Sequence, residues 1–452
     1  MHRLHSGFTV ADEITVATEI MPDPSGSLKR VLQKLSKKGS NFLHQLKDCQ
    51  STLFISGVIL PQEDYYLTGT QKKPETLPKT FVFATTYCGP FSNHLEEMIQ
   101  TNKNVLCEIF KHCKNFPPED LRTNERVAAY LRSHSHNSAF NSRYNCITKQ
   151  DAKREKQLRK EIENYIDKAQ GLHAFDNRSA LEVKTLIQRH IATRGDKYEW
   201  CHKPERKNII ELYFINRGKI IPVLLLLMLL IFLSCRPRYI FHFIAISLVA
   251  ILLTIFLVSE IRKYISREES EPAKRVADRK LRSIATSQQR PVLNEMTAAA
   301  ALKKGRLRRF FYAFALKVIN ILAPFLMKVP TVSNLRWLVV NDRKRLLFLS
   351  NFSNTTDFYV RDFLNGNTPI GVNFMFTNGQ GFPDAKMLTR EGITSDPEGY
   401  MDAVHTGQKI TDLWYAHEPH LTADIINKNR KIRNGLFKKM NEDEANQWLK
   451  LL

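Results

Sequence analysis

Several motifs that mark common enzymes are missing from this sequence. No glycine-rich phosphate loop follows an apolar run, and neither a GxSxG nor an HExxH pattern occurs, so the usual nucleotide-hydrolase, serine-hydrolase and zinc-protease signatures are absent. The seven cysteines form no CxxC pair, which argues against a zinc ribbon and is typical of free thiols in a reducing compartment. The N-terminus lacks an apolar core followed by a cleavage site, so we do not expect a signal peptide.

Acidic residues are also scarce relative to basic ones. The 452-residue chain has 67 Lys and Arg against 45 Asp and Glu, a formal net charge of +22. Such an excess predicts an anionic partner, either nucleic acid or an anionic membrane surface. Because no nucleic-acid-binding motif is present, we expect a lipid bilayer with anionic headgroups rather than nucleic acid.

What the sequence does contain is a long-range repeat. Residues 80–99 read TFVFATTYCGPFSNHLEEMI, and residues 345–364 read RLLFLSNFSNTTDFYVRDFL. Each passage opens with an apolar run, becomes small and polar, and ends in an amphipathic run, a pattern that indicates strand, turn and helix. IFKHCKNFPPE (109–119) and MFTNGQGFPDA (375–385) then match in order. These matches predict a duplicated domain.

A long apolar stretch separates the two copies. Ile220–Ser234 has almost no polar residue and Tyr239–Val258 has no charge, which predicts two membrane-spanning helices joined by the turn 235–238. Five Lys and Arg lie on each flank against two in the turn. By the positive-inside rule, both termini are then cytoplasmic and the chain lies in the cell inner (plasma) membrane. Tyr198 and Trp200 suit an interfacial aromatic belt. A buried hairpin of a soluble protein is the alternative.

Two further segments combine apolar and basic residues. Residues 25–48 place leucines on one face and lysines mostly on the other, interrupted at Gly39. This pattern fits a helix that lies on a membrane surface, or one that docks on its own protein. Residues 306–328 are apolar but carry Lys317 and Asn320 near the middle, so we interpret them as an interfacial or buried helix.

The candidate site lies at the two corners where strand, turn and helix meet. If the copies pair, polar groups of both corners would line a ligand pocket. The pocket candidates are Thr86, Tyr87, Gly89, His94, His112, Asn351, Phe352 and Asn378. Titratable groups belong to the first copy, because Tyr359 and Asn378 stand where the first copy has His94 and His112. A metal site from His94, His112 and Cys113 is conceivable, but solvated or structural side chains explain the same residues, and we predict no metal.

The two halves resemble a membrane-anchored bacterial family. YCGPFSNHLEEMI and IFKHC in the first half, and TNGQGFPDA and LWYAHEPHLTADIINKNRKIRNGL in the second, carry the resemblance, which covers roughly residues 51–165 and 290–437. It implies two similar ferredoxin-like halves, loosely like the dye-decolorising peroxidase fold, and with that fold a haem cofactor as one alternative. Cys88 and Ser353 stand where the family pattern has Asp, which puts carboxylate chemistry there in doubt.

We therefore predict an α+β fold, with two repeated ferredoxin-like domains as a pseudo-dimer and a two-helix transmembrane hairpin. The predicted division is an N-terminal segment with an amphipathic helix (1–50), the first repeat (51–170), a basic linker (171–208), the hairpin (209–260), a basic juxtamembrane linker with a second amphipathic helix (261–329) and the second repeat (330–452). The predicted function is binding of an unidentified ligand or protein partner at a membrane. A haem- or redox-dependent, peroxidase-like oxidoreductase is the alternative, so whether the protein is an enzyme stays open.

Overall fold

The computed structural model describes most of the chain outside residues 203–272. The described ranges are 11–23, 25–37, 39–65, 75–143, 148–202, 275–288, 292–303, 305–326, 331–365, 375–383 and 395–452, with single positions at 244, 248–249, 251–253, 255–256, 259, 273, 290 and 329. Residues 11–202 are called the first half below, and residues 275–452 the second half.

The first sheet is antiparallel and has the order β1-β5-β2-β11. Its strands are β1 (Ala11–Glu19), β5 (Thr80–Cys88), β2 (Thr52–Leu60) and β11 (Leu413–Ala416). β1 pairs along the whole of β5, and β2 pairs with the other edge of β5 after a bulge at its start. Every residue of β5 is buried, because this strand, rich in aromatic and β-branched residues, is central and covered on both faces.

The second sheet is also antiparallel, with the order β10-β7-β9-β8-β6. Its strands are β10 (Gln408–Lys409), β7 (Leu293–Ala301), β9 (Arg345–Ser353), β8 (Val332–Val340) and β6 (Ala139–Ser142). β7 pairs along the whole of β9, and β8 pairs with the other edge of β9 after a bulge at its start. A small hairpin, β3 (Glu63–Tyr65) with β4 (Glu75–Leu77), completes the described strands.

Each half lends a short edge strand to the sheet of the other half. β6 of the first half pairs with β8, with Ala139 opposite Trp337. β11 of the second half pairs with β2, with Leu413 opposite Gly57. The hydrogen bonds of both ladders therefore join segments that are far apart in the sequence, and neither sheet is complete without the other half.

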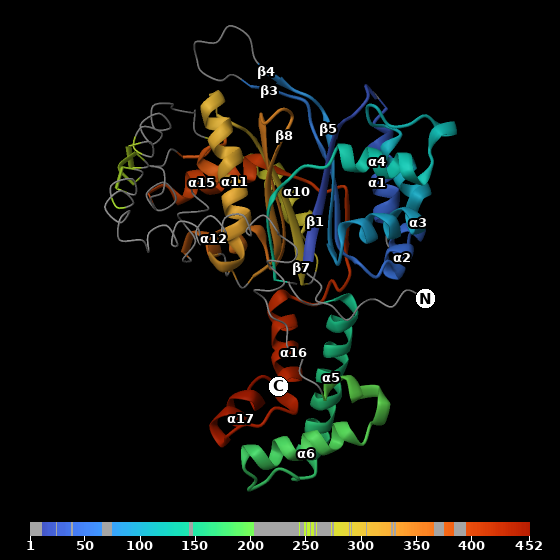
Figure 1. Ribbon diagram of the computed structural model, residues 1–452, viewed down its shortest axis with the longest axis vertical. Helices are drawn as coiled ribbons and strands as arrows, with labels where there is room; N and C mark the ends of the chain where they lie inside the picture. The colour runs from blue at the N-terminus through green and yellow to red at the C-terminus, as the bar shows by residue number, and fades with distance from the viewer. Residues whose placement is uncertain are drawn as a thin grey trace.

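The two sheets lie face to face in the middle of the body, with helices on both outer sides (Figure 1). The helices outside the first sheet are α1 (Ser27–Ser36), α2 (Asn41–Asp48), α3 (Phe91–Phe110) and α4 (Asn124–Ser133), with the short η1 (Glu119–Leu121) between the last two. The second sheet is covered by α11 (Arg306–Leu326), α12 (Thr356–Asn365) and α15 (Pro397–Gly407), and α10 (Asp278–Ser287) precedes β7. Each helical layer buries its own apolar cluster against its sheet.

A buried ion pair links the two sheets. Between them lies an apolar cluster made largely of alanine, valine and leucine side chains. Beside it Arg336 of β8 reaches the first sheet, where its Nη1 lies 2.8 Å from Oε2 of Glu13 and 3.1 Å from the carbonyl oxygen of Thr85. Both side chains are less than a tenth exposed. Because breaking a buried pair leaves an uncompensated charge, this contact fixes how the sheets face each other.

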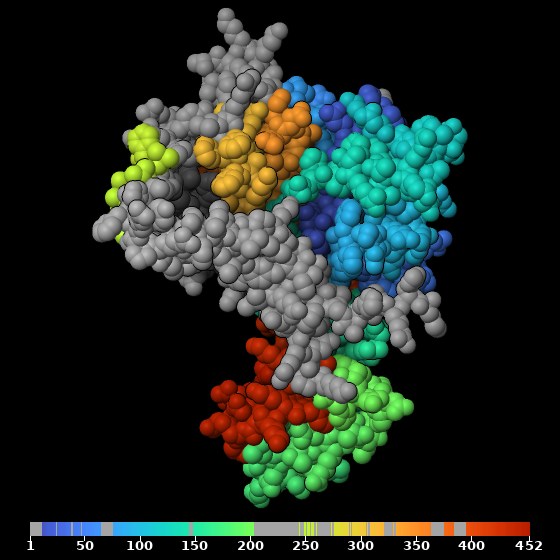
Figure 2. Space-filling model, in the orientation of Figure 1, coloured from blue at the N-terminus to red at the C-terminus, as the bar shows by residue number. Residues whose placement is uncertain are grey.

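A helical extension, which we call the stalk, stands out from one end of the body (Figure 2). It consists of α5 (Lys149–Gly171), α6 (Ala180–Ala192), η2 (Gly195–Cys201), α16 (Ala423–Leu436) and α17 (Glu442–Leu449). Capping boxes begin α5 at Thr148, α6 at Ser179 and α17 at Asn441, which satisfies backbone N–H groups at these exposed ends. Apolar residues of both halves form its separate core.

The predicted membrane location is corrected. In the part of the chain that the structure describes, no helix is both long and apolar enough to cross a bilayer, which contradicts the prediction of two spans with cytoplasmic termini in a plasma membrane. That prediction followed from the length of two apolar runs, and the hairpin 209–260 lies almost wholly outside the described residues. The apolar helix α11 instead buries Tyr312 and Leu316 in the core beside the second sheet.

Candidate functional site

The corner of the first half is built around His94. Gly89 has a φ of 97°, a left-handed turn that suits glycine, and α3 begins after Pro90. This turn places His94 in the first helical turn, where its ring stacks on Tyr87 with centroids 4.2 Å apart. Its Nδ1 lies 2.8 Å from Oγ of Ser51, and its Nε2 lies 3.0 Å from Oγ1 of Thr85. Both ring nitrogens therefore have hydrogen-bond partners.

Glu97 ties the same corner to the start of β2. Its carboxylate accepts hydrogen bonds from the backbone N–H of Gln50 at 2.6 Å and of Ser51 at 3.0 Å. It also accepts one from the hydroxyl of Ser51. The serine therefore lies between the carboxylate and the imidazole. In a Ser-His-Asp triad the imidazole lies between the other two groups, so this arrangement does not activate the serine.

Burial removes His94 from acid–base chemistry near neutral pH. The side chain is 1% exposed, and burial lowers its pKa to about 3. The ring is therefore neutral at pH 7, far from the poise of a general base. The corner is packed rather than open, and its geometry is that of a structural hydrogen-bond network.

The corner of the second half repeats this geometry with other side chains. Tyr359 stacks on Phe352 with centroids 4.2 Å apart, and its hydroxyl donates to Oγ of Ser350 at 2.8 Å. Asp362 accepts a hydrogen bond from Oγ1 of Thr331 at 2.8 Å. Asn351 is also bonded, because its Oδ1 accepts from Nε1 of Trp414 at 2.8 Å.

The other predicted site residues lie apart from these two rings. Thr86 is fully buried and accepts a hydrogen bond from Arg336 between the sheets. Asn378 is buried near α11, where its carbonyl oxygen accepts from the N–H of Lys303 at 2.9 Å. His112 follows the C-terminal end of α3, so it lies roughly 27 Å from His94 along the helix direction. The structure thus does not bring His94 and His112 together.

The histidine of the first corner is not placed as a haem ligand. An axial histidine binds the haem iron through a ring nitrogen, whereas both nitrogens of His94 are hydrogen-bonded within the protein and Tyr87 covers its ring. In the described ranges, no group of three or more His, Cys, Asp and Glu side chains is placed to hold a metal ion.

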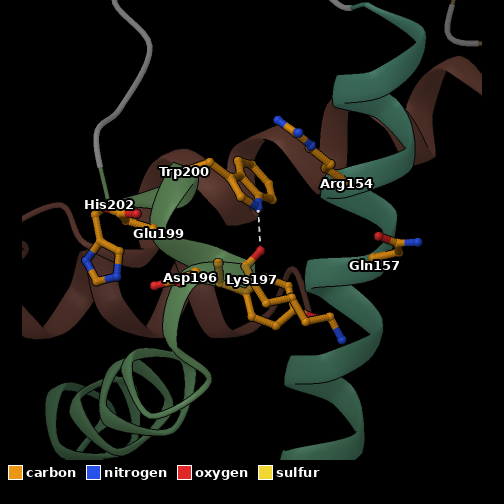
Figure 3. A pocket seen from close by; sticks show the side chains of 8 residues that line it. Arg154, Gln157, Asp196, Lys197, Glu199, Trp200 and His202 are labelled. Carbon is orange, nitrogen blue, oxygen red and sulfur yellow. Dashed lines mark hydrogen bonds between the residues drawn. The ribbon is translucent and has the colours of Figure 1, made fainter.

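An open cavity of about 780 Å³ lies in the stalk, between α5 and η2 (Figure 3). Its wall on α5 is formed by Arg154 and Gln157. The opposite wall is formed by Asp196, Lys197, Tyr198, Glu199, Trp200 and His202. Its volume lies within the range of small-molecule sites, and aromatic and charged side chains meet in it.

The fold of η2 determines how this wall presents its side chains. Tyr198 and Cys201 are buried in the stalk core, and Tyr198 also lines the cavity. The indole Nε1 of Trp200 donates to the carbonyl oxygen of Lys197 at 3.1 Å. The ring of His202 stacks on Phe437 with centroids 4.0 Å apart. Both rings are therefore held in fixed orientations.

Sequence reasoning missed this cavity. The segment GDKYEWCH (195–202) alternates charged and aromatic residues, and that signal was interpreted as the aromatic belt of a membrane helix. The opposite wall comes from α5, about 40 residues earlier in the sequence, so no local pattern could join the two.

Comparisons with known proteins add no identity. No protein family matches this chain, and no curated protein matches it either. The resemblance to a bacterial family therefore stays a prediction.

Proposed function

We propose that this protein is a binding protein whose ligand site is the stalk cavity, and that the two-sheet body is the rigid support of that site. The observation that carries the proposal is the contrast between the corners and the cavity. His94 and Tyr359 are 1% and 0% exposed, whereas the stalk cavity is open and lined by polar and aromatic groups. Ligand sites are concave places where a few polar groups converge beside apolar surface.

We further propose that the body consists of two ferredoxin-like copies. The matching strand pairings and bulges of the two sheets support this proposal. A second correspondence lies in the first strand of each sheet. Thr15 donates to Glu13 at 2.7 Å in β1, and Thr297 donates to Glu295 at 2.7 Å in β7. Two copies that exchange edge strands form a stiff platform, because neither copy can open without losing ladder hydrogen bonds.

A thermal-shift screen tests the binding function. The full chain is heated in the presence of anionic, cationic and neutral metabolites, and a ligand at 100 times its Kd is expected to add about 2.7 kcal/mol to the free energy of unfolding. Trp200→Leu and Arg154→Gln, each weakening the ligand about tenfold, should reduce this stabilisation to about 1.4 kcal/mol at the same ligand concentration. Lys160→Gln, an exposed change elsewhere on α5, should leave the shift intact.

The screen can also contradict the proposal. A ligand whose shift survives both cavity variants, but disappears in His94→Gln, would place the site at the corner. An absence of any shift across the three chemical classes would count equally against a binding function of the stalk cavity.

A further inference from the structure

We propose that the stalk cavity binds a planar aromatic ring that carries an anionic group, such as a nucleoside phosphate. This inference rests on the proposed binding function and names its ligand class. It depends on two features of the cavity: an oriented indole ring, and a cationic side chain on each of the two walls.

Trp200 provides the surface for the aromatic ring. The residue is half-buried, and its orientation is fixed by the hydrogen bond from its Nε1 to the carbonyl oxygen of Lys197. The guanidinium of Arg433 lies over the indole, 5.7 Å from the ring centroid. Arg433 is not among the lining residues of the cavity, so we infer that the other face of the indole is directed to it. Because the indole N–H is already hydrogen-bonded, the ring face would recognise a ligand by stacking.

Arg154 and Lys197 provide the positive charge. Figure 3 shows Arg154 on α5 above the indole, and Lys197 on η2 with its side chain reaching toward α5. The nearby carboxylate of Glu161 is paired with Arg194 at 3.0 Å and also interacts with Lys197. The ammonium of Lys197 lies 5.2 Å from the centroid of the Tyr198 ring. The guanidinium of Arg154 suits a phosphate or carboxylate group, and Lys197 adds a second positive charge to the same cavity.

Two acidic residues, Asp196 and Glu199, also line the cavity. In Figure 3 the side chains of Asp196 and Glu199 extend from η2 to the side that faces away from α5, near His202. The two carboxylates thus lie on the opposite side of η2 from the two cations. The anion is expected on the α5 side, where the two cations lie, and the volume of about 780 Å³ accommodates a ring with its acidic group.

Calorimetric titration of the full chain with three probes tests this inference. Adenosine 5′-monophosphate has both the ring and the anion, adenosine has the ring alone, and ribose 5-phosphate has the anion alone. We expect the monophosphate to bind at least about tenfold more tightly than either fragment, because stacking and charge pairing each contribute. Its affinity should fall with added salt, as expected for contacts to a phosphate.

Variants assign each contact to its side chain. Trp200→Leu should weaken the monophosphate about tenfold and leave ribose 5-phosphate unchanged. Arg154→Gln and Lys197→Gln should each weaken both phosphate-bearing probes about tenfold and leave adenosine unchanged. Lys160→Gln should change nothing, and circular dichroism should show that all four variants are folded.

Four outcomes would overturn the inference. Adenosine binding as tightly as the monophosphate would remove the anion from the recognition. Ribose 5-phosphate binding as tightly would remove the ring. If none of the probes binds, while a ligand from the thermal-shift screen does and depends on Trp200, the ligand class is wrong and the binding function stands. If no ligand from either experiment binds, both proposals fail.

Discussion

One position in each half is filled by a different ring that makes the same contacts. His94 and Tyr359 each stack on a ring seven residues earlier, at Tyr87 and Phe352. Each also bonds a hydroxyl nine residues earlier. Histidine and tyrosine have no chemistry in common there, but both are flat, amphipathic and able to form a hydrogen bond. The position is therefore explained by packing, and the sequence alignment of the halves is consistent with that explanation.

The burial of His94 leads to a pH-dependent prediction. The unfolded pKa is near 6.5 and burial lowers the folded pKa to about 3, so below pH 6.5 the unfolded state binds a proton that the folded state does not. Stability is therefore lost as pH falls through this window, by up to about 1.4 kcal/mol per pH unit. His94→Gln should be less stable than the natural chain at pH 8, and this gap should shrink by about 2 kcal/mol at pH 5. Urea unfolding at both values measures the gap.

Tyr359→Phe is the matched control for that experiment. It removes the equivalent hydrogen bond, at a cost of about 1 kcal/mol, but replaces no group that titrates in this range. Its gap to the natural chain should be the same at pH 5 and pH 8. A gap for His94→Gln that stays constant, or widens toward pH 5, would contradict a neutral buried imidazole.

Residue types alone did not predict the environment of the candidate site. His94 and Glu97, one turn apart on a helix, have the composition of a catalytic pair. Their environment is decided by Ser51, more than 40 residues earlier, and by the depth of α3 against the sheet. Sequence patterns identified the corner and its repetition. They did not reveal that it is closed, because burial depends on contacts distant in the chain.

The stalk helices α5 and α16 meet through a buried carboxyl group. Glu155 of α5 is 2% exposed, and one of its oxygens lies 3.4 Å from Nε of Arg430 on α16. Burial raises the pKa of Glu155 to about 7, although Arg430 opposes this effect. Between pH 4.5 and pH 7 the folded state then binds more protons than the unfolded state, so stability decreases as pH rises.

Glu155→Gln should remove this pH dependence. Because of this group, the natural chain should lose roughly 3 kcal/mol of unfolding free energy between pH 4.5 and pH 7. The variant should not show this loss. Its unfolding free energy relative to the natural chain should therefore be higher at pH 8 than at pH 4.5. Urea unfolding followed by circular dichroism at pH 4.5 and pH 8 measures the difference. Glu163→Gln, which removes a partly exposed pair with Arg159 on the same helix, should change stability by less than about 1 kcal/mol at both values. Equal pH profiles for the natural chain and Glu155→Gln would contradict the assignment.

Some of the helices and strands in the structure were predicted from the sequence and others were not, for physical reasons. Strand-turn-helix units after residues 80 and 345, and an amphipathic segment at 25–48 broken near Gly39, follow from local periodicity and match β5, β9, α1 and α2. β1 was missed inside the N-terminal segment because its alternation is weak. The exchange of β6 and β11 has no local signature, since it depends on the pairing of two halves.

The two halves are interlocked in a way that makes the body a poor place for a mobile binding site. Exchanged edge strands and the buried pair of Arg336 with Glu13 join the sheets from both sides. The net charge alone predicts an anionic partner but not where it binds. In the described part of the chain, cations and aromatic rings surround an open cavity in the stalk. We therefore propose that the stalk recognises the ligand and that the body supports the stalk.

Hydrogen exchange of the full chain, with and without the tightest ligand of the thermal-shift screen at saturation, tests this assignment most directly. The account predicts slower amide exchange at residues 195–202 and 153–158, the two walls of the cavity, and unchanged exchange at 85–98 and 350–362. Protection confined to the corners, with the stalk unchanged, would contradict it.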